Sequence, residues 1–133
     1  HVYDFYKKLL QNKKKLKVLG NGNQKKSYIY IKDCIEAVIC SMKYYKKDVN
    51  IVNIGHNNFI TVKQSIKYIT NHLCLSPRLI FSSKKSSGWH GDNSFIHLNI
   101  NKLKKTGWKP KTSIKDGVIK TLSYLENNKW LLD

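Results

Sequence analysis

The chain has 133 residues, of which 41% are hydrophobic, and its 25 lysine and arginine residues against 8 acidic ones give a net charge of +17. This length suits a single domain or a piece of one, and the apolar content is typical of a folded chain rather than a disordered one. No apolar run reaches the length of a membrane span and no signal-peptide pattern is present, which argues against a membrane protein and predicts a soluble, cytoplasmic one.

The positive charge is almost entirely lysine, because Arg78 is the only arginine. Nucleic-acid sites favour arginine, whose planar group contacts bases and phosphates through two parallel hydrogen bonds. The lysines are also scattered along the whole chain. We therefore expect a general affinity for anions and no specific nucleic-acid site. Three cysteines, Cys34, Cys40 and Cys74, lack the spacing of metal ligands, and no metal site is expected.

The first third of the chain predicts a helix followed by two strands. Apolar residues at helical spacing predict the helix over Val2–Gln11. Leu16–Leu19 and the apolar run Tyr28–Ile31 are typical of strands. Between them, Gly20 and Gly22 permit a tight backbone turn.

The middle of the chain predicts a helix and a buried strand. Asp33 and Glu36 have the spacing of a helix capping box. The helix should end near Tyr45, and its apolar face should consist of Ile35, Val38, Ile39 and Met42. Asn50–Ile54 has the composition of a strand buried in a parallel sheet.

The last part of the chain predicts three helices and one strand. Thr61 and Gln64 form a second capping-box pattern, which opens a helix with Ile66, Ile69 and Leu73 on its apolar face. Leu79–Phe81 is an expected strand. Asn99 should cap a short helix that Gly107 stops, and Ser113 should start the last helix, whose apolar face comprises Ile114, Val118, Ile119, Leu122 and Leu125. Strands that alternate with helices predict an α/β fold, here taken as one domain over 1–133.

The Gly20–Gly22 turn also has a chemical interpretation. Lys25 and Lys26 place positive charge beside a turn that allows close approach of the backbone to a ligand, and this combination suits a phosphate. The local alternative is a charged surface hairpin with no ligand.

Two sequence blocks around this turn resemble a known family. The stretch GNGNQKKSYIYIKDCIEA (20–37) and the stretch GWHGDNSFIHLNINKLKKTGWKP (88–110) are similar to segments of the extended short-chain dehydrogenases/reductases, the NAD-dependent sugar-nucleotide epimerases and dehydratases. An Asn-Ile-Gly strand end at Asn53–Gly55 lies between them in the family's order. The resemblance covers nearly the whole chain and is greatest to UDP-glucose 4-epimerases.

The resemblance implies only the C-terminal, substrate-binding part of such an enzyme. The glycine-rich NAD turn of the Rossmann fold is absent. Two Tyr-x-x-x-Lys matches, at Tyr3–Lys7 and Tyr28–Lys32, lack the context of the family's catalytic pair and are expected by chance. We therefore predict no catalytic residue in this chain, NAD bound only in a full-length enzyme, and an N-terminal Rossmann half as partner. The full-length enzyme could form a homodimer, and the sequence leaves this question open.

The resemblance also assigns substrate-binding positions, namely Gly20, Asn21, Gly22, Gln24, Lys26, Tyr28, Trp89 and Asp92. Lys26 stands where the family has an arginine that binds the nucleotide diphosphate, and Asp92 where an acidic residue accepts hydrogen bonds from the ribose. A second family arginine aligns with Ser87, a loss that Lys84 or Lys85 could offset. The plain alternatives are a solvated surface lysine and an aspartate that forms a local turn.

The predicted function is thus the nucleotide-sugar binding part of an NAD-dependent epimerase or dehydratase, inactive on its own. Two alternatives stay open. One is a small basic α/β module that binds nucleic acid, which would need lysines gathered on one face. The other is a truncated gene product without function.

Overall fold

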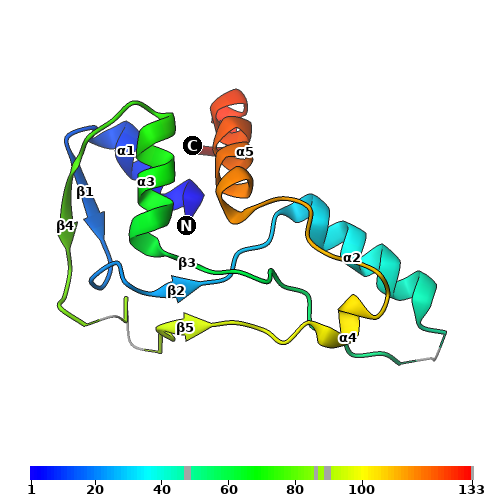
Figure 1. The fold of residues 1–133 in the computed structure, drawn as a ribbon. Coiled ribbons are helices and arrows are strands. Elements are labelled where there is room, and N and C mark those ends of the chain that lie inside the picture. The colour runs from blue at the N-terminus through cyan, green and yellow to red at the C-terminus, as the bar shows by residue number, and fades with distance from the viewer. Residues whose placement is uncertain (47–48, 86, 89–90, 133) are drawn as a thin grey trace.

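The computed structural model describes residues 1–46, 49–85, 87–88 and 91–132 (Figure 1). The helices are α1 (Val2–Gln11), α2 (Ile31–Tyr44), α3 (Val62–His72), α4 (Asn101–Lys104) and α5 (Ile114–Asn127), followed by a 3-10 turn at Lys129–Leu132. The strands are β1 (Lys15–Val18), β2 (Lys25–Lys26), β3 (Ile60–Thr61), β4 (Arg78–Phe81) and β5 (Phe95–Ile96). This mixture confirms the expected α/β class.

The strands form two small sheets. β1 and β4 are parallel, with Leu16 opposite Leu79. The second sheet has the order β3-β2-β5, in which β2 runs antiparallel to β3 and parallel to β5. β1 and β2 therefore belong to different sheets, and the Gly20–Gly22 turn joins the two sheets instead of closing a hairpin. The surface-hairpin alternative for this stretch is thereby excluded.

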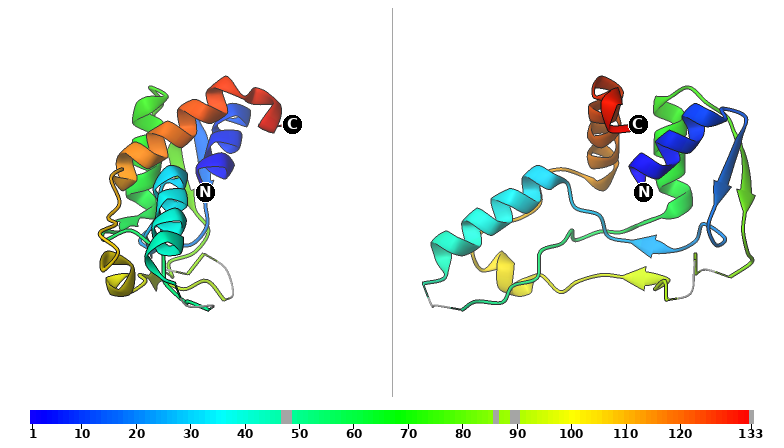
Figure 2. Two further views of the ribbon diagram at one scale, coloured as in Figure 1. Left: turned by 90° about the vertical axis from the view of Figure 1, so that its right-hand side faces the viewer. Right: turned by 180° about the vertical axis from the view of Figure 1, so that it is seen from behind.

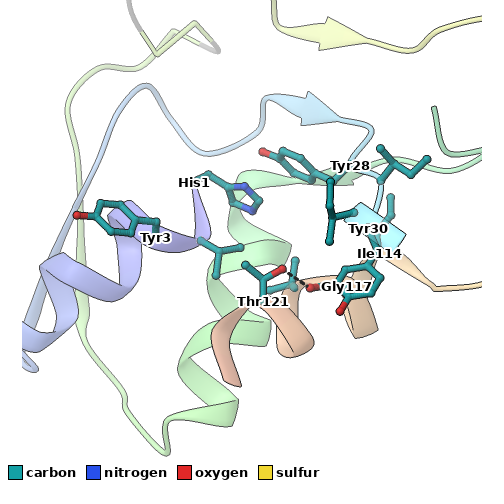
Figure 3. Close-up of a pocket in the computed structure, with 11 residues that line it drawn as sticks. His1, Tyr3, Tyr28, Tyr30, Ile114, Gly117 and Thr121 are labelled. Atoms are coloured by element: carbon teal, nitrogen blue, oxygen red, sulfur yellow. Dashed lines mark hydrogen bonds between the residues drawn. The ribbon is translucent and has the colours of Figure 1, made fainter. Parts of the chain in front are cut away.

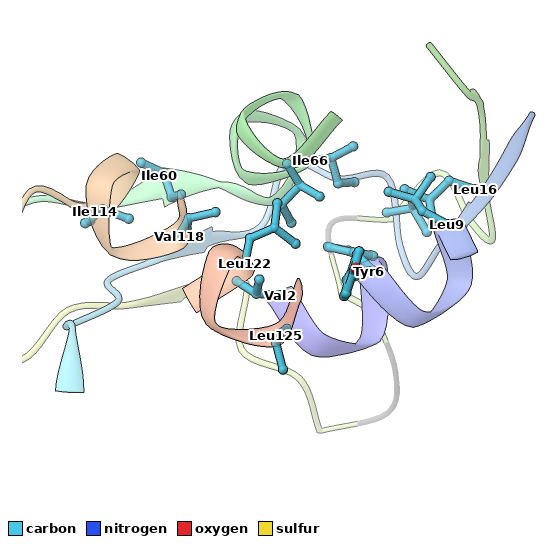
Figure 4. Packing of buried hydrophobic residues seen from close by; sticks show 13 residues of the cluster. Val2, Tyr6, Leu9, Leu16, Ile60, Ile66, Ile114, Val118, Leu122 and Leu125 are labelled. Carbon is cyan, nitrogen blue, oxygen red and sulfur yellow. The ribbon is translucent and has the colours of Figure 1, made fainter. Parts of the chain in front are cut away.

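The main hydrophobic core lies between α1, α3, α5 and the β1–β4 pair (Figure 4). Helical spacing on α1 and α5 turns one apolar stripe of each helix toward α3, as the sequence pattern predicts. The buried members of this core are Val2, Phe5, Tyr6, Leu9, Leu16, Val18, Ile60, Ile66, Ile69, Ile114, Val118, Leu122 and Leu125.

A second, smaller cluster anchors α2 to α4 and consists of Ala37, Ile100, Leu103 and Trp108. Polar contacts reinforce it: the buried Asp33 Oδ2 accepts a hydrogen bond from the backbone N–H of Thr112 (2.9 Å), and the Tyr45 hydroxyl donates to the carbonyl of Lys102 (2.9 Å). Seen from behind, α2 extends away from α1 and α3 (Figure 2). Only one side of α2 is packed by this cluster.

Several helix caps and helix ends that the sequence predicts are confirmed. The Thr61 side chain accepts from the Gln64 N–H while the Gln64 side chain accepts from the Thr61 N–H, a complete capping box. Ser113 caps α5 by accepting from the N–H of Asp116 (3.1 Å). Gly107 has φ +81° after α4, the left-handed residue expected there. The Asn99 side chain accepts from the Asn101 N–H, although Ile100 occupies the N-cap position itself.

The strand predicted at Tyr28–Ile31 is wrong. The second strand is Lys25–Lys26, residues 27–30 are extended without strand pairing, and α2 already begins at Ile31. The reason is that β3 and β5, both distant in sequence, pair only with Lys25 and Lys26. Asp33 is consequently the third helical residue and points inward to Thr112, so its predicted capping role is wrong as well.

Two expectations about burial also fail. Within the described residues no strand forms at Asn50–Ile54, and the apolar face predicted for α2 is exposed. The β4 strand exists, but three of its four residues are exposed and only Leu79 is partly buried. Of two tryptophans in the last part of the chain, Trp108 is buried and Trp130 is exposed.

Candidate functional site

The Gly20–Gly22 turn brings its glycines against other parts of the chain. Gly20 has φ +71° and Gly22 φ +76°, backbone conformations that L side chains rarely adopt. A Cβ on Gly20 would come within 2.4 Å of Gln24 Nε2 and 2.9 Å of the Ser87 carbonyl oxygen. The Gly20 N–H donates to Ser82 Oγ (2.8 Å). The close approach at Gly20 therefore serves the protein's own packing, and its N–H is not free for a phosphate.

Lys26 and Asp92 form an ion pair across the base of the loop that precedes β5. Lys26 Nζ lies 2.7 Å from Asp92 Oδ1, and it also donates to the carbonyl oxygen of Asn93. Asp92 Oδ2 accepts from the Gly88 N–H (2.8 Å). The hydrogen bond from Lys26, then that from Gly88, hold the pKa of Asp92 below its usual value. The alternative of a solvated surface lysine is not supported, because the side chains of both residues are largely shielded from solvent. The alternative of a local role for Asp92 stays open, since its contact with Gly88 lies within the same loop.

Gln24 lies between the turn and this ion pair. Its Nε2 donates to the Leu19 carbonyl (2.9 Å), and it would lie 3.3 Å from a Cβ placed on Gly88. Gln24 is buried, and among the described residues its Oε1 has no hydrogen-bond partner. A buried amide oxygen without a donor costs free energy, so it is a candidate acceptor for an N–H or O–H of a ligand.

Tyr28 connects this network to a neighbouring pocket. Burial, and next the negative charge of Asp92, raise the pKa of Tyr28 to about 12. Its ring stacks on that of His1 with the centroids 4.0 Å apart. The tyrosine therefore stays protonated at neutral pH and can act as a hydrogen-bond donor.

The pocket beside Tyr28 has a volume of about 390 Å³ (Figure 3). It lies between α1, α5 and the extended residues before α2. Its lining is mostly apolar and includes His1, Tyr3, Tyr28, Tyr30, Ile114 and Thr121. His1 also hydrogen-bonds through Nε2 with Ser65 Oγ (2.7 Å). His1 and Tyr30 were not predicted as site residues, because no local pattern in the sequence connects them with Tyr28.

The structure brings most of the predicted site residues into one region. Gln24, Lys26 and Asp92 are joined through the contacts of Gly20 and Gly88 described above. Asn21 contacts the segment after β4, where its Nδ2 donates to the Lys84 carbonyl (2.9 Å). Trp89 lies outside the described residues. Lys26 does not offer the free positive charge that was expected, because its Nζ already donates to Asp92 and to the Asn93 carbonyl and keeps one remaining N–H.

The glycine turn does not fit NAD. A dinucleotide site needs open glycines at the start of a helix, where the pyrophosphate meets free N–H groups. Here the turn leads into β2, and the space beside both glycines is filled, at Gly22 by the side chains of Lys63 and Phe81. The turn therefore offers no site for the NAD pyrophosphate.

Comparison with known proteins identifies the family. The family model described as GDP-mannose 4,6 dehydratase matches residues 1–121. The UDP-D-apiose/UDP-D-xylose synthase 2 of Arabidopsis thaliana is 32% identical over 127 residues, which cover 86% of this chain and 33% of the synthase. The dTDP-4-dehydro-6-deoxyglucose reductase of Escherichia coli is 30% identical over 106 residues, covering 79% and 32%.

Solved structures of sugar-nucleotide epimerases have a similar fold over most of this chain. A UDP-galactose 4-epimerase superposes with a TM-score of 0.82 at 29% identity, over 97% of this chain and 41% of the epimerase. The UDP-glucuronic acid 4-epimerase of Bacillus cereus, solved with UDP-glucuronic acid and NAD, has the same fold, with a TM-score of 0.77 at 21% identity and 40% coverage of that chain.

The fold and these matches define a part of an extended short-chain dehydrogenase/reductase. The chain belongs to the GDP-mannose 4,6-dehydratase family of NAD-dependent sugar-nucleotide epimerases and dehydratases. It spans about two fifths of the solved relatives and about a third of the curated ones named above.

Among the described residues, no helix combines the length and apolarity that a membrane crossing requires. In the same part of the chain, no three His, Cys, Asp or Glu side chains gather as metal ligands would.

Proposed function

We propose that this chain is the C-terminal, nucleotide-sugar binding part of an NAD-dependent epimerase or dehydratase. The observation that carries the proposal is the Lys26–Asp92 ion pair. It joins β2 to the loop that contains Gly91 and Asp92, and its two residues are 66 positions apart in the chain. These are the two positions that the family resemblance assigns to the diphosphate and the ribose. Relatives whose structures contain UDP-sugars support this substrate class.

The chemistry of the site suits binding rather than catalysis. Lys26 can contribute its remaining N–H to a phosphate oxygen, and the free Oε1 of Gln24 can accept from a ligand hydroxyl or amide. The protonated Tyr28, which lines the apolar pocket, supplies a hydrogen-bond donor. The catalytic pair and the NAD turn belong, in this proposal, to the N-terminal Rossmann half.

The nucleic-acid alternative is less well supported. Lysines occur on all five helices of the described structure, including α1, α3 and α5, which meet in the core from different sides. A nucleic-acid footprint needs them on one contiguous face. This distribution of lysines is more typical of side chains that face solvent than of a specific nucleic-acid site.

The experiment that tests the proposed function is calorimetric titration of UDP-glucose, UDP and GDP-mannose into this chain joined to a complementary N-terminal half. We expect saturable binding of at least one nucleotide sugar with one site per chain. Equal, non-saturating heats for all three compounds, indistinguishable from those of inorganic phosphate, would contradict the proposal.

A further inference from the structure

His56 is a buried polar residue that the nucleotide-sugar site does not use. It is only 7% exposed, and its Nδ1 accepts a hydrogen bond from the Asn58 backbone N–H (3.0 Å). Because a backbone N–H can only donate, the ring carries its proton on Nε2. Within the described part of the chain, this Nε2–H has no acceptor. A buried donor without a partner costs free energy, so His56 marks a place for an acceptor.

His56 lines a pocket, which we call the His56 pocket, with a volume of about 460 Å³. The pocket lies between the loop that precedes β3 and the first turns of α3 and α5, two helices that stand side by side (Figure 1). Phe59, Gln64, Tyr68 and Lys115 are among its other lining residues. This volume lies within the range of small-molecule sites.

Three further side chains of the His56 pocket carry donors without acceptors. The Gln64 Oε1 accepts from the backbone N–H (2.7 Å) and the hydroxyl (3.1 Å) of Thr61, and its amide N–H groups have no partner among the residues that the structure describes. In that same part of the chain, the Tyr68 hydroxyl and the Lys115 ammonium are also unpaired. The described lining includes no aspartate or glutamate. The pocket is therefore rich in donors and poor in competing acceptors.

The charges around the His56 pocket favour an anion. Lys115 lines the pocket, and Lys67 lines the groove that continues from it between α3 and α5. The N-terminus of α5, with its partial positive charge, also lies at the pocket. Asp116, in the first turn of α5, accepts a hydrogen bond from Ser113 Oγ (2.7 Å) and does not line the pocket.

The loop that holds His56 is fixed by its neighbours. Ser27 Oγ lies 3.0 Å from the His56 carbonyl oxygen and 2.9 Å from that of Asn58. His97 Nε2 donates to the carbonyl of Asn57 (3.2 Å). These contacts order the loop before any ligand binds, which lowers the entropic cost of binding at the His56 donor.

We propose that the His56 pocket binds a phosphate group, which accepts hydrogen bonds from His56 Nε2 and the Lys115 ammonium. A phosphate has at least three acceptor oxygens and up to two negative charges, whereas a carboxylate has two oxygens and one charge. The larger number of acceptors matches the several unpaired donors of the pocket. Gln24, Lys26 and Asp92 do not line it, so this inference does not depend on the proposed nucleotide-sugar site.

The test is calorimetric titration of inorganic phosphate, phenyl phosphate and acetate into the 133-residue chain that carries Lys26→Ala, a change that removes the other candidate anion contact. We expect saturable binding of phosphate with one site per chain, and binding of acetate that is at least about tenfold weaker. Tighter binding of phenyl phosphate would assign the site to a phosphate monoester, and tighter binding of inorganic phosphate would assign it to the free ion. Heats that do not saturate, or equal affinities for phosphate and acetate, would overturn the proposal.

Variants locate the phosphate within the pocket. Lys115→Ala should weaken phosphate binding at least about tenfold, the loss expected for a charged hydrogen bond. Lys120→Ala is the matched control, because it removes the same charge from the same helix while its Nζ lies over the Tyr30 ring, 5.4 Å from the centroid. Equal losses for the two lysine variants would contradict the proposal.

His56→Asn tests the buried donor. The asparagine Oδ1 can still accept from the Asn58 N–H, whereas the Nε2 donor is lost. We expect phosphate binding to weaken by about three- to tenfold and urea unfolding to change little. In the chain that retains His56, the ¹⁵N resonance of its Nε2 should shift during the phosphate titration. An unshifted resonance and an unchanged affinity in His56→Asn would overturn the role of His56.

Discussion

Lys26 Nζ and Asp92 Oδ1 lie 2.7 Å apart although 66 residues separate them in the chain. Lys26 belongs to the central strand of the three-stranded sheet, and Asp92 lies just before β5, which pairs with that strand. The strand pairing therefore positions the ion pair. The two predicted ligand contacts, that of Lys26 with a diphosphate and that of Asp92 with a ribose, therefore both depend on this ion pair.

The ion pair should make stability depend on pH in the acid range. The pKa of Asp92 is lowered in the folded state, so the carboxylate's contribution is fully present above its unfolded pKa of ~3.9 and is lost as the pH falls through the lower, folded pKa. We expect the difference in free energy of unfolding between the native protein and Asp92→Asn to shrink from pH 5 to pH 2. Urea unfolding at each pH measures it, and a constant difference would contradict the account.

Gly20 should tolerate a methyl group less well than Gly107. Both have positive φ, so Gly→Ala costs ~1–2 kcal/mol of conformational strain at either position. Only at Gly20 would the new Cβ collide with Gln24 Nε2 and the Ser87 carbonyl, whereas nothing lies within 4 Å at Gly107. Thermal unfolding should therefore show a larger loss for Gly20→Ala, and equal losses would contradict the packing described for the turn.

Asp33 should contribute more to stability than an exposed aspartate. Asp33→Ala would leave the Thr112 N–H without its acceptor, at a cost of ~1–3 kcal/mol, and Asp33→Asn should retain much of the contact. Asp4→Ala removes only an exposed pair with Lys8 and should cost ~0–0.5 kcal/mol. Urea denaturation of the three variants checks this order. A loss for Asp33→Ala no larger than that for Asp4→Ala would contradict it.

Nucleic acid should bind weakly. With the lysines dispersed and a single arginine, we expect duplex DNA to bind at ~0.15 M salt with a Kd of ~10⁻⁴–10⁻⁶ M and without sequence preference. Fluorescence anisotropy with two unrelated duplexes measures this. Nanomolar, sequence-selective binding would instead support the nucleic-acid module.

Some elements were predictable because their determinants are local. The Thr61–Gln64 capping box and the Ser113 cap depend on contacts between residues three positions apart. Helical spacing similarly predicted the buried stripe of α5. In contrast, β2 forms at Lys25–Lys26, two lysines with little strand propensity, because β3 and β5 pair there. Such tertiary effects override the apolar run at Tyr28–Ile31.

The candidate site was predictable only in part. The family resemblance supplied Lys26 and Asp92, yet no local pattern indicates that the two side chains pair with each other. Gly20 was expected to leave room for a ligand, and the structure shows that Gln24 fills this room. Ile35, Val38, Ile39 and Met42 were expected to form the apolar face of α2, and all four are exposed. Helical spacing predicts that such residues share a face, but it does not specify which partner covers that face.

The most direct test of the proposed site compares Lys26→Ala with Lys25→Ala in the chain joined to a complementary N-terminal half. Lys25 is adjacent and equally charged, but its Nζ lies over the Phe59 ring, 5.2 Å from the centroid, away from Asp92. Calorimetric titration with UDP-glucose should show a loss of ~1.5–3 kcal/mol for Lys26→Ala, the range of a charged hydrogen bond, and almost none for Lys25→Ala. Equal affinities in the two variants would contradict a diphosphate site at Lys26.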